Sequence, residues 1–331
     1  QRQMCIRDSD ETVEYARQFM EIILLGNVVT HLYLGLNAVL RASGHPKQAM
    51  YATIATVAIN TILAPIFIFM FDWGIRGAAI ATVSAQVIAL LWQLKQFNNA
   101  NELLHFRRGI FRLKRKIVFD SLAIGMSPFL MNLAACLIVI LINQGLKKYG
   151  GDLAIGAFGI VNRLVFIVVM IVMGLNQGMQ PIAGYNFGAK LYDRVNKVLK
   201  LTIIYATCVT TFGFLVGMLA PNLVVGIFTS DAELTELSAT GLRITVMFFP
   251  IIGFQMVTSN FFQSIGMAGK AIFLSLTRQM LILLPCLLIL PHFFGVAGVW
   301  YSMPVSDLLA SLIALVMLVY QFRKFKTAAA H

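Results

Sequence analysis

The chain has 331 residues, of which 59% are hydrophobic and only 12% are charged. A soluble domain carries about 25% charged residues and about half apolar residues, so this composition excludes an ordinary soluble protein. The formal net charge of +12 lies mainly in loops on one side of the apolar stretches, which argues against nucleic acid as a partner.

Apolar stretches without Lys, Arg, Asp or Glu recur along the whole chain. Most reach the length of about 20 residues that a helix needs to cross the ~30 Å hydrocarbon core of a membrane. They do not alternate apolar and polar residues as the strands of a membrane barrel do. We therefore predict an all-α, polytopic transmembrane helix bundle with nine spans, the last of which also uses residues before Asp307. In chain order the stretches are Ile22–Leu40, Gln48–Phe71, Gly77–Leu94, Ser121–Leu146, Leu164–Ala189, Leu201–Ser230, Ile244–Gly269, Gln279–Ser306 and Leu308–Phe322.

The first three predicted spans resemble the last three. Pro65 interrupts the second span as Pro285 interrupts the eighth, and the third and ninth spans open with Gly74–Gly77 and Gly295–Gly298. An acidic segment precedes both the first and the seventh span, and the offset stays at about 221 residues, as in an internal repeat. Six helices separate each feature from its copy, so the two halves have the same orientation in the membrane. We expect twelve helices in two parallel six-helix lobes, with three helices missing before residue 10.

The repeat divides the chain into segments. The first residues, QRQMCIRDS, fit no part of the pattern, and we expect them to be unrelated to the fold or artefactual. A polar, basic stretch between the halves is typical of a connection between two bundles. The predicted segments are 1–9 (artefactual N-terminus), 10–94 (last three helices of the N-lobe), 95–116 (cytoplasmic linker), 117–326 (complete six-helix C-lobe) and 327–331 (tail).

The basic residues predict the orientation of the chain. Most loop Lys and Arg residues fall on one side if the Arg41–Lys47 loop is cytoplasmic, whereas the opposite loops hold only Arg76, Lys147 and Lys148. Because cytoplasmic loops retain Lys and Arg, this asymmetry places the C-terminus in the cytoplasm. The four cysteines show no paired spacing, so neither a disulfide framework nor a metal site is indicated.

Three motifs carry a resemblance to a known family. Residues 174–189 read GLNQGMQPIAGYNFGA, Gly77–Gln86 read GAAIATVSAQ, and a polar turn spans Arg41–Lys47. In this order they resemble the multidrug and toxic compound extrusion (MATE) family, over residues 10–326. The resemblance implies a multi-pass antiporter of the bacterial inner membrane with two six-helix lobes. It implies export of organic cations and drugs in exchange for sodium ions or protons, with no cofactor beyond that coupling ion.

Other functions fit parts of the same pattern. A lipid-linked oligosaccharide flippase of the same superfamily shares the fold but requires a more cationic central cavity. A major-facilitator carrier also has six plus six parallel helices, but Tyr185–Gly188 stands where its loop motif belongs. An intramembrane enzyme needs a nucleophile, base or metal cluster at membrane depth, and the sequence shows no such constellation, so we expect no enzyme. A non-transporting integral membrane protein is the alternative from another class.

Asp307 is the first candidate for ion coupling, because an ionisable group inside a bilayer is costly and is retained mainly for function. It lies midway along the last span, and Gln86 holds the matching position of the first half. Two interpretations stay open at this point. Asp307 either pins helices by pairing with Arg278 or Arg163, or exchanges a proton or cation during transport.

Asn60, Thr82 and His31 are further ion-coupling candidates in the first half. The resemblance implies a cation site on an Asn-x-x-x-Asp-Pro element, which here runs from Asn60 to Pro65 with Ala64 in place of the acid. Thr82 matches a threonine of the next helix. Acids that another branch of the family carries in its second lobe are absent, so sodium and proton coupling stay open. His31 is either a proton relay or a buried, hydrogen-bonded side chain.

Polar residues within the predicted spans are candidates for a substrate cavity, because polar side chains avoid lipid and face the interior of a bundle. The 16 methionines and 25 phenylalanines suit flexible binding of flat apolar cations. We expect the two lobes to rock about this cavity while ion binding shifts the populations of inward-facing and outward-facing states. The expected partners are small-molecule drugs and membrane lipid. The cavity candidates are Asn162, Arg163, Asn176, Gln177, Gln180, Gln255, Asn260 and Arg278.

Overall fold

The structure is a computed structural model that describes residues 2–99, 105 and 114–329. Throughout this described part the regular elements are helices. The chain divides into two compact units, residues 1–113 and 114–331. The boundary lies within the predicted linker, most of which falls outside the described residues.

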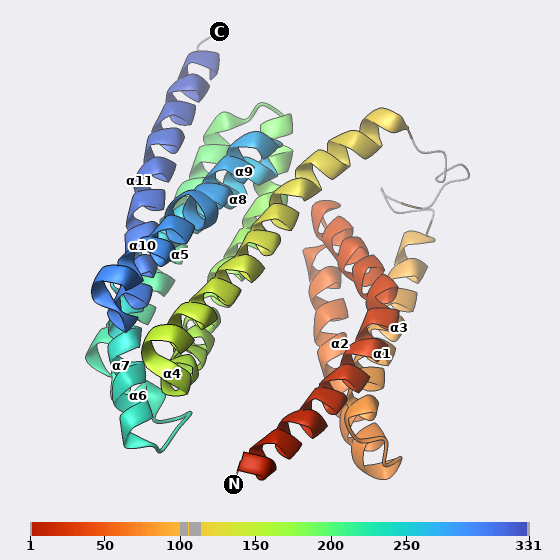
Figure 1. Ribbon diagram of the computed structural model, residues 1–331. Coiled ribbons are helices and arrows are strands. Elements are labelled where there is room, and N and C mark those ends of the chain that lie inside the picture. The colour runs from red at the N-terminus through yellow and green to blue at the C-terminus, as the bar shows by residue number, and fades with distance from the viewer. Residues whose placement is uncertain (1, 100–104, 106–113, 330–331) are drawn as a thin grey trace. The chain divides into compact units, whose positions relative to one another are not determined.

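The first unit contains three helical spans. Helix α1 (Arg2–Ala42) is followed by α2 (Pro46–Pro65), the π-helical segment η1 (Ile66–Met70) and α3 (Gly74–Phe97). Helix α1 packs against both α2 and α3 (Figure 1), and one face of each helix contributes to a small apolar core. Helix α1 also runs through residues 2–9, which the sequence pattern did not place in the fold.

The second unit contains the longer part of the chain. Its helices pack around two apolar clusters, which draw residues from both its early and its late helices. In chain order its elements (Figure 1) are α4 (Arg115–Gly188), α5 (Tyr192–Leu219), α6 (Pro221–Val225), α7 (Ala232–Val246), α8 (Phe249–Ser264), α9 (Ala268–Leu276), the π-helical segment η2 (Thr277–Leu283), α10 (Leu284–Phe294) and α11 (Val296–Ala329).

Helix α4 is broken at Gly151. The helix has 74 residues, and a straight helix of that length would measure about 110 Å, more than three times the ~30 Å hydrocarbon core. Gly151 has φ 67° and ψ −163°, a conformation that is essentially restricted to glycine. The break divides α4 into two arms, residues 115–150 and 152–188 (Figure 1). The sequence predicts the same division, because Lys147 and Lys148 separate two apolar stretches.

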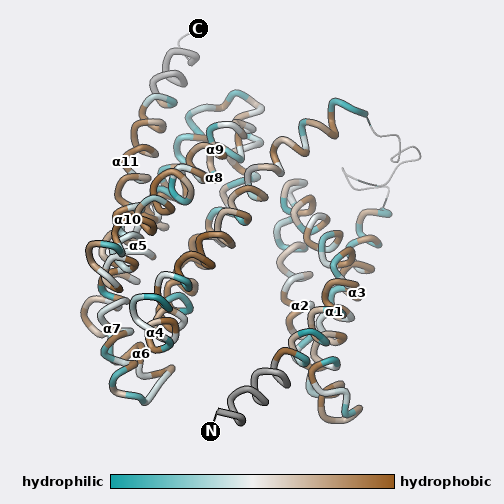
Figure 2. The backbone as a smooth tube through the Cα atoms, in the orientation of Figure 1, coloured by the Kyte–Doolittle hydropathy of each residue, from teal (hydrophilic) through white to brown (hydrophobic). Residues whose placement is uncertain are grey.

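Seven helices of the described residues are long and apolar enough to cross a membrane. The α7 and α8 pair passes the same test when its two helices are taken together, and it is bent by 54° at its break. Counting this pair as one span and each arm of α4 as another gives the nine spans that the sequence predicts. Hydrophobic residues recur along these helices (Figure 2). Many of their large apolar side chains are exposed, for example Leu25 (83%) and Val316 (70%), as expected of surfaces that face lipid.

The turns that open α3 and α11 have the same construction. Gly74 and Gly295 both adopt positive φ angles, 51° and 57°, which glycine tolerates because it lacks a Cβ atom. Three residues later, Gly77 and Gly298 each lie so close to the preceding helix that a Cβ atom would collide with its backbone. A π-helical segment, η1 or η2, lies in the helical region before each turn. The sequence repeat is therefore matched by a repeat in backbone conformation.

Candidate functional site

The second unit holds an ion pair that joins two of its candidate membrane spans. Arg278 Nε donates a hydrogen bond to Asp307 Oδ1 at 2.7 Å. The side chain of Asp307 is only 4% exposed, whereas that of Arg278 is 33% exposed. A carboxylate removed from water needs a close cation, and a charge-assisted hydrogen bond of this length supplies one. Asp307 therefore pairs with Arg278 rather than with Arg163, the other partner that the sequence left open.

Irregular backbone surrounds both members of this pair. Arg278 is the second residue of η2, and π-helical turns occur frequently at functional sites. Pro285 follows in the first turn of α10, where it has no N–H to offer. Asp307 lies on α11 three residues after Pro304, which removes another backbone donor. The ion pair thus joins two spans at points where their regular hydrogen bonding is weakened.

Two neutral hydrogen bonds join further helices of the second unit. Gln180 Nε2 donates to Asn260 Oδ1 at 3.2 Å and links the second arm of α4 to α8. The hydroxyls of Ser259 and Ser275 lie 2.9 Å apart and link α8 to α9. The predicted cavity residues Gln180 and Asn260 therefore meet, and these polar groups satisfy one another between helices instead of facing lipid.

Asn176 and Gln255 are both buried, with exposed fractions of 2% and 4%. Neither polar atom of the Asn176 side chain has a hydrogen-bond partner among the described residues. A buried polar atom without a partner costs about 1–3 kcal/mol. The position of Asn176 therefore fits a residue that contacts a polar group of a transported molecule or ion.

Asn162, Arg163 and Gln177 are exposed on the second arm of α4. On a membrane-spanning helix a polar side chain is costly against lipid and favours a protein interior or a water-filled cavity. These three residues thus stay predictions as cavity residues, at positions that other parts of the protein or a substrate can reach.

The predicted ion-coupling residues of the first unit are held mainly by their own helices. Thr82 Oγ1 donates to Ala78 O at 3.0 Å. His31 is exposed, and its Nδ1 lies 2.9 Å from Asn27 O. Asn60 differs, because its Oδ1 is buried and has no hydrogen-bond partner within the described part of the chain. Of these three residues, Asn60 therefore retains an acceptor that a cation or a donor could use.

The polar partners Thr30, Ser259 and Ser275 were not predicted from the sequence. Thr30 Oγ1 donates to Gln86 Oε1 at 2.5 Å and joins α1 to α3. Hydroxyl residues give little sequence signal, because most of them bond to the backbone of their own helix. The one indication in the sequence came from the repeat, because Gln86, the partner of Thr30, occupies the position that Asp307 holds in the second unit.

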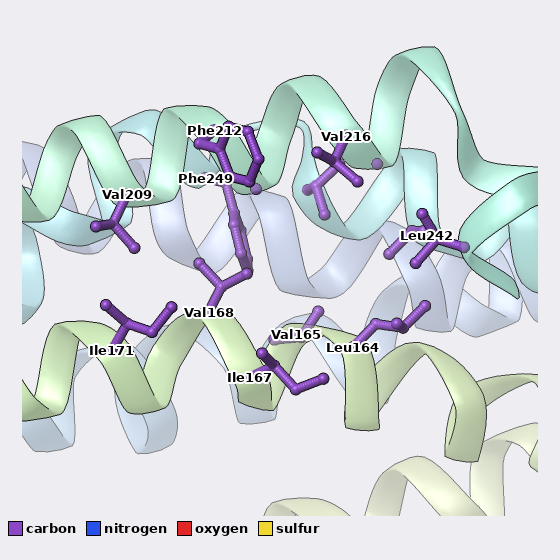
Figure 3. A pocket seen from close by; sticks show the side chains of 14 residues that line it. Leu164, Val165, Ile167, Val168, Ile171, Val209, Phe212, Val216, Leu242 and Phe249 are labelled. Atoms are coloured by element: carbon purple, nitrogen blue, oxygen red, sulfur yellow. The ribbon is translucent and has the colours of Figure 1, made fainter. Parts of the chain in front are cut away.

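An apolar groove lies between the second arm of α4 and α5 (Figure 3). Its cavity volume is about 230 Å³, and residues of α6, α7 and α8 complete its lining. Figure 3 shows Val168 and Ile171 of α4 opposite Val209 and Phe212 of α5. None of the predicted coupling or cavity residues lines this groove, so it is separate from the polar contacts described above.

Comparison with known proteins reveals relatives over most of the chain. The MatE family model matches residues 4–66 and 124–288. The chain is 28% identical over 319 residues to the multidrug export protein MepA of Staphylococcus haemolyticus (strain JCSC1435), covering 95% of this chain and 69% of that protein. It is also 28% identical over 317 residues to MepA of Staphylococcus aureus (strain MSSA476), covering 95% of this chain and 68% of that protein.

Solved structures show the same fold. The structure of the MATE multidrug transporter DinF-BH in complex with a ligand matches with a TM-score of 0.85 and 34% identity, over 94% of this chain and 70% of that one. An outward-facing MATE family transporter of the MOP superfamily matches with a TM-score of 0.88 and 23% identity, over 96% of this chain and 71% of that one. Because the family model covers more than half of the sequence, the chain belongs to the multidrug and toxic compound extrusion (MATE) family, whose members are membrane transporters and not enzymes.

Proposed function

We propose that the protein carrying this chain is a secondary active multidrug efflux transporter, which exports organic cations and drugs in exchange for sodium ions or protons. Its relatives support this proposal, because the MepA proteins are multidrug export proteins and the multidrug transporter DinF-BH was solved with a small molecule bound. Hard cations prefer oxygen ligands, and the candidate residues Asp307, Asn60 and Thr82 all carry side-chain oxygens.

The observation that carries the coupling is the Arg278–Asp307 ion pair. A proton or cation that reaches Asp307 competes with Arg278 for the carboxylate charge. Since the Arg278 side chain is already one-third exposed, its guanidinium can turn toward water once the coupling ion has replaced it. The pair thus has two arrangements, one closed on itself and one loaded with an ion, as a coupled transporter requires.

The location of Arg278 in η2 connects these two arrangements to a larger movement. Loading Asp307 would release the contact between η2 and α11, and with it one constraint on the α9–η2–α10 span. Ion loading would in this way favour one access state over the other, while the two lobes rock about the substrate. Gln180, Asn260 and the buried amide of Asn176 are the polar groups that we propose for contact with substrate.

The distribution of charge supports an inner-membrane location with a cytoplasmic C-terminus. Arg194, Lys197 and Lys200 are exposed at the start of α5, on the side where the sequence predicts the cytoplasm. Lys and Arg are retained on that side during insertion, and anionic headgroups of the inner leaflet attract them. Membrane lipid is therefore a proposed partner of these basic residues.

Transport in membrane vesicles tests the proposal. Inside-out vesicles from a drug-sensitive bacterial host that expresses the protein would be incubated with a fluorescent organic cation under an imposed sodium or proton gradient. We expect uptake into these vesicles to require one of the two gradients and to stop when that gradient is collapsed. Uptake equal to that of control vesicles under both gradients, with the protein present in the membrane, would refute the proposal.

A further inference from the structure

The groove between α4 and α5 opens outward through an exposed, apolar rim. Ile167, Ile171 and Phe212 are 56%, 52% and 68% exposed, and all three line the groove (Figure 3). The helices that carry them have the length and composition of membrane spans. The rim therefore has the composition of a surface that faces lipid.

The floor of the groove is deeply buried. Leu242 and Val246 of α7 and Phe249 of α8 are each 3% exposed. Two glycines of α5 permit close packing around the groove, because a Cβ atom on Gly213 would lie 2.9 Å from Val168 of the α4 wall and one on Gly217 would lie 3.1 Å from Val246 of the floor. A ligand that reaches the floor therefore enters the interior of the unit and does not merely cover its surface.

The lining excludes polar occupants. Every residue that lines the groove is aliphatic, aromatic or glycine. Sites for drug-like molecules combine apolar walls with a few precisely placed polar groups, and the groove offers none. Water and ions would lose their hydrogen bonds there without compensation. A hydrocarbon chain has no hydrogen bonds to lose there, and it can fill the groove by van der Waals packing against the apolar walls.

The depth of the groove identifies the leaflet. Lys200 is the last of the exposed basic residues at the start of α5. The part of α5 that lines the groove runs from Val209 to Gly217. At 1.5 Å per residue these positions lie about 14 to 26 Å beyond Lys200 along the helix axis. In a hydrocarbon core ~30 Å thick, the groove therefore lies largely in the leaflet opposite the basic loops.

We propose that this groove binds one acyl chain of a membrane phospholipid from the leaflet opposite the basic loops. The chemistry of the lining, the exposed rim and the depth all favour this occupant. Hydrocarbon chains also surround the rim at very high concentration, so mass action favours filling even at modest affinity. The bound chain touches both sides of the α7–α8 break, since Leu242 and Val246 precede the break and Phe249 follows it. It therefore supports the bent form of this span.

Photolabelling with a phospholipid that carries a diazirine at the end of one acyl chain tests this inference. The protein would be reconstituted into vesicles that contain the probe, illuminated, digested and mapped by mass spectrometry. We expect adducts on the buried floor residues Leu242, Val246 and Phe249. Adducts confined to exposed rim residues such as Phe212 would show an ordinary lipid surface and would overturn the proposal.

Substitutions that fill the groove sharpen the test. Val216→Trp, or Val209→Phe if the first variant misfolds, places an aromatic ring among the lining residues. An aromatic ring in the space of the bound chain should cause the loss of most of the floor labelling. Leu219→Trp is the matched control on the same helix, because Leu219 is 80% exposed and does not line the groove. Floor labelling that persists in a folded filled variant would contradict the inference, and transport activity does not enter either readout.

Discussion

Gln86 of α3 and Asp307 of α11 occupy matching positions of the internal repeat but make different bonds. Gln86 accepts a neutral hydrogen bond from Thr30 at 2.5 Å, whereas Asp307 accepts a charged one from Arg278 at 2.7 Å. The partners also come from different elements, α1 in the first unit and η2 in the second. The repeat thus provides one position with two chemistries, and only the charged one responds directly to a proton or cation.

Asp307→Asn should abolish drug efflux while leaving membrane expression intact, because an amide cannot carry the charge that the coupling ion neutralises. The measurement is resistance of a drug-sensitive host, together with protein abundance in the membrane. The double variant Arg278→Gln with Asp307→Asn removes both charges and distinguishes a structural pair from a coupling pair. Efflux restored in the double variant would show that the pair only fastens two helices.

Arg278→Gln should destabilise the protein, because it leaves the buried carboxylate of Asp307 without its cation. Breaking a buried ion pair costs up to about 3–5 kcal/mol. Solvent screening at the one-third exposed Arg278 side chain places the effect at the lower end of this range. Thermal unfolding of detergent-solubilised protein, followed by size-exclusion chromatography, measures the change. Arg163→Gln is the control, since an exposed arginine on a span should shift stability by no more than about 0.5 kcal/mol.

Gly253→Ala should separate α8 from α5. A Cβ atom at this position would lie 2.8 Å from both Ala206 O and Thr210 Oγ1, and a backbone oxygen cannot move aside as a flexible side chain can. Overpacking of this kind costs about 1–3 kcal/mol. The matched substitution Gly174→Ala meets no atom within 4 Å. Equal unfolding temperatures for the two variants would show that the helices tolerate the extra methyl group.

Gly151→Ala should strain the break in α4. The φ of 67° and ψ of −163° at this residue are nearly exclusive to glycine, so an alanine there costs about 1–3 kcal/mol. Gly159→Ala, in the helical second arm with open space around it, should instead stabilise by about 0.5–1 kcal/mol. The two variants should change stability in opposite directions, so a difference in expression level cannot account for the result. A Gly151→Ala protein as stable as the parent would show that the break relaxes to another conformation.

The sequence predicted the helical class and the number of spans because charged residues interrupt the apolar stretches. It placed the seventh span at Ile244–Gly269, whereas the structure begins the bent α7–α8 pair at Ala232. Glu233, Glu236 and Arg243 caused this difference, since a search for uncharged stretches rejects a helix that carries them. The predicted eighth span, Gln279–Ser306, was also wrong in its bounds, because the structure has one span at Ala268–Phe294 and begins α11 at Val296. Local charge therefore indicated how many spans there are but not where each begins and ends.

The partners of polar side chains were harder to predict. Arg278 and Arg163 are equivalent in the sequence as possible partners of Asp307, and the packing of η2 against α11 decides between them. The Gln180–Asn260 contact joins residues from two different spans, and a single sequence does not reveal which faces meet. Type and depth of a polar residue could be predicted, but its neighbour depends on tertiary packing.

The break at Gly151 also sets the sidedness of the later helices and loops. An unbroken α4 would carry residue 152 onward in the direction of the first arm, away from the bilayer, and every later loop would exchange compartments. The basic residues at the start of α5 would then face the wrong side, against the charge rule for insertion. The predicted sidedness of every later loop of the second unit therefore depends on the change of direction at Gly151.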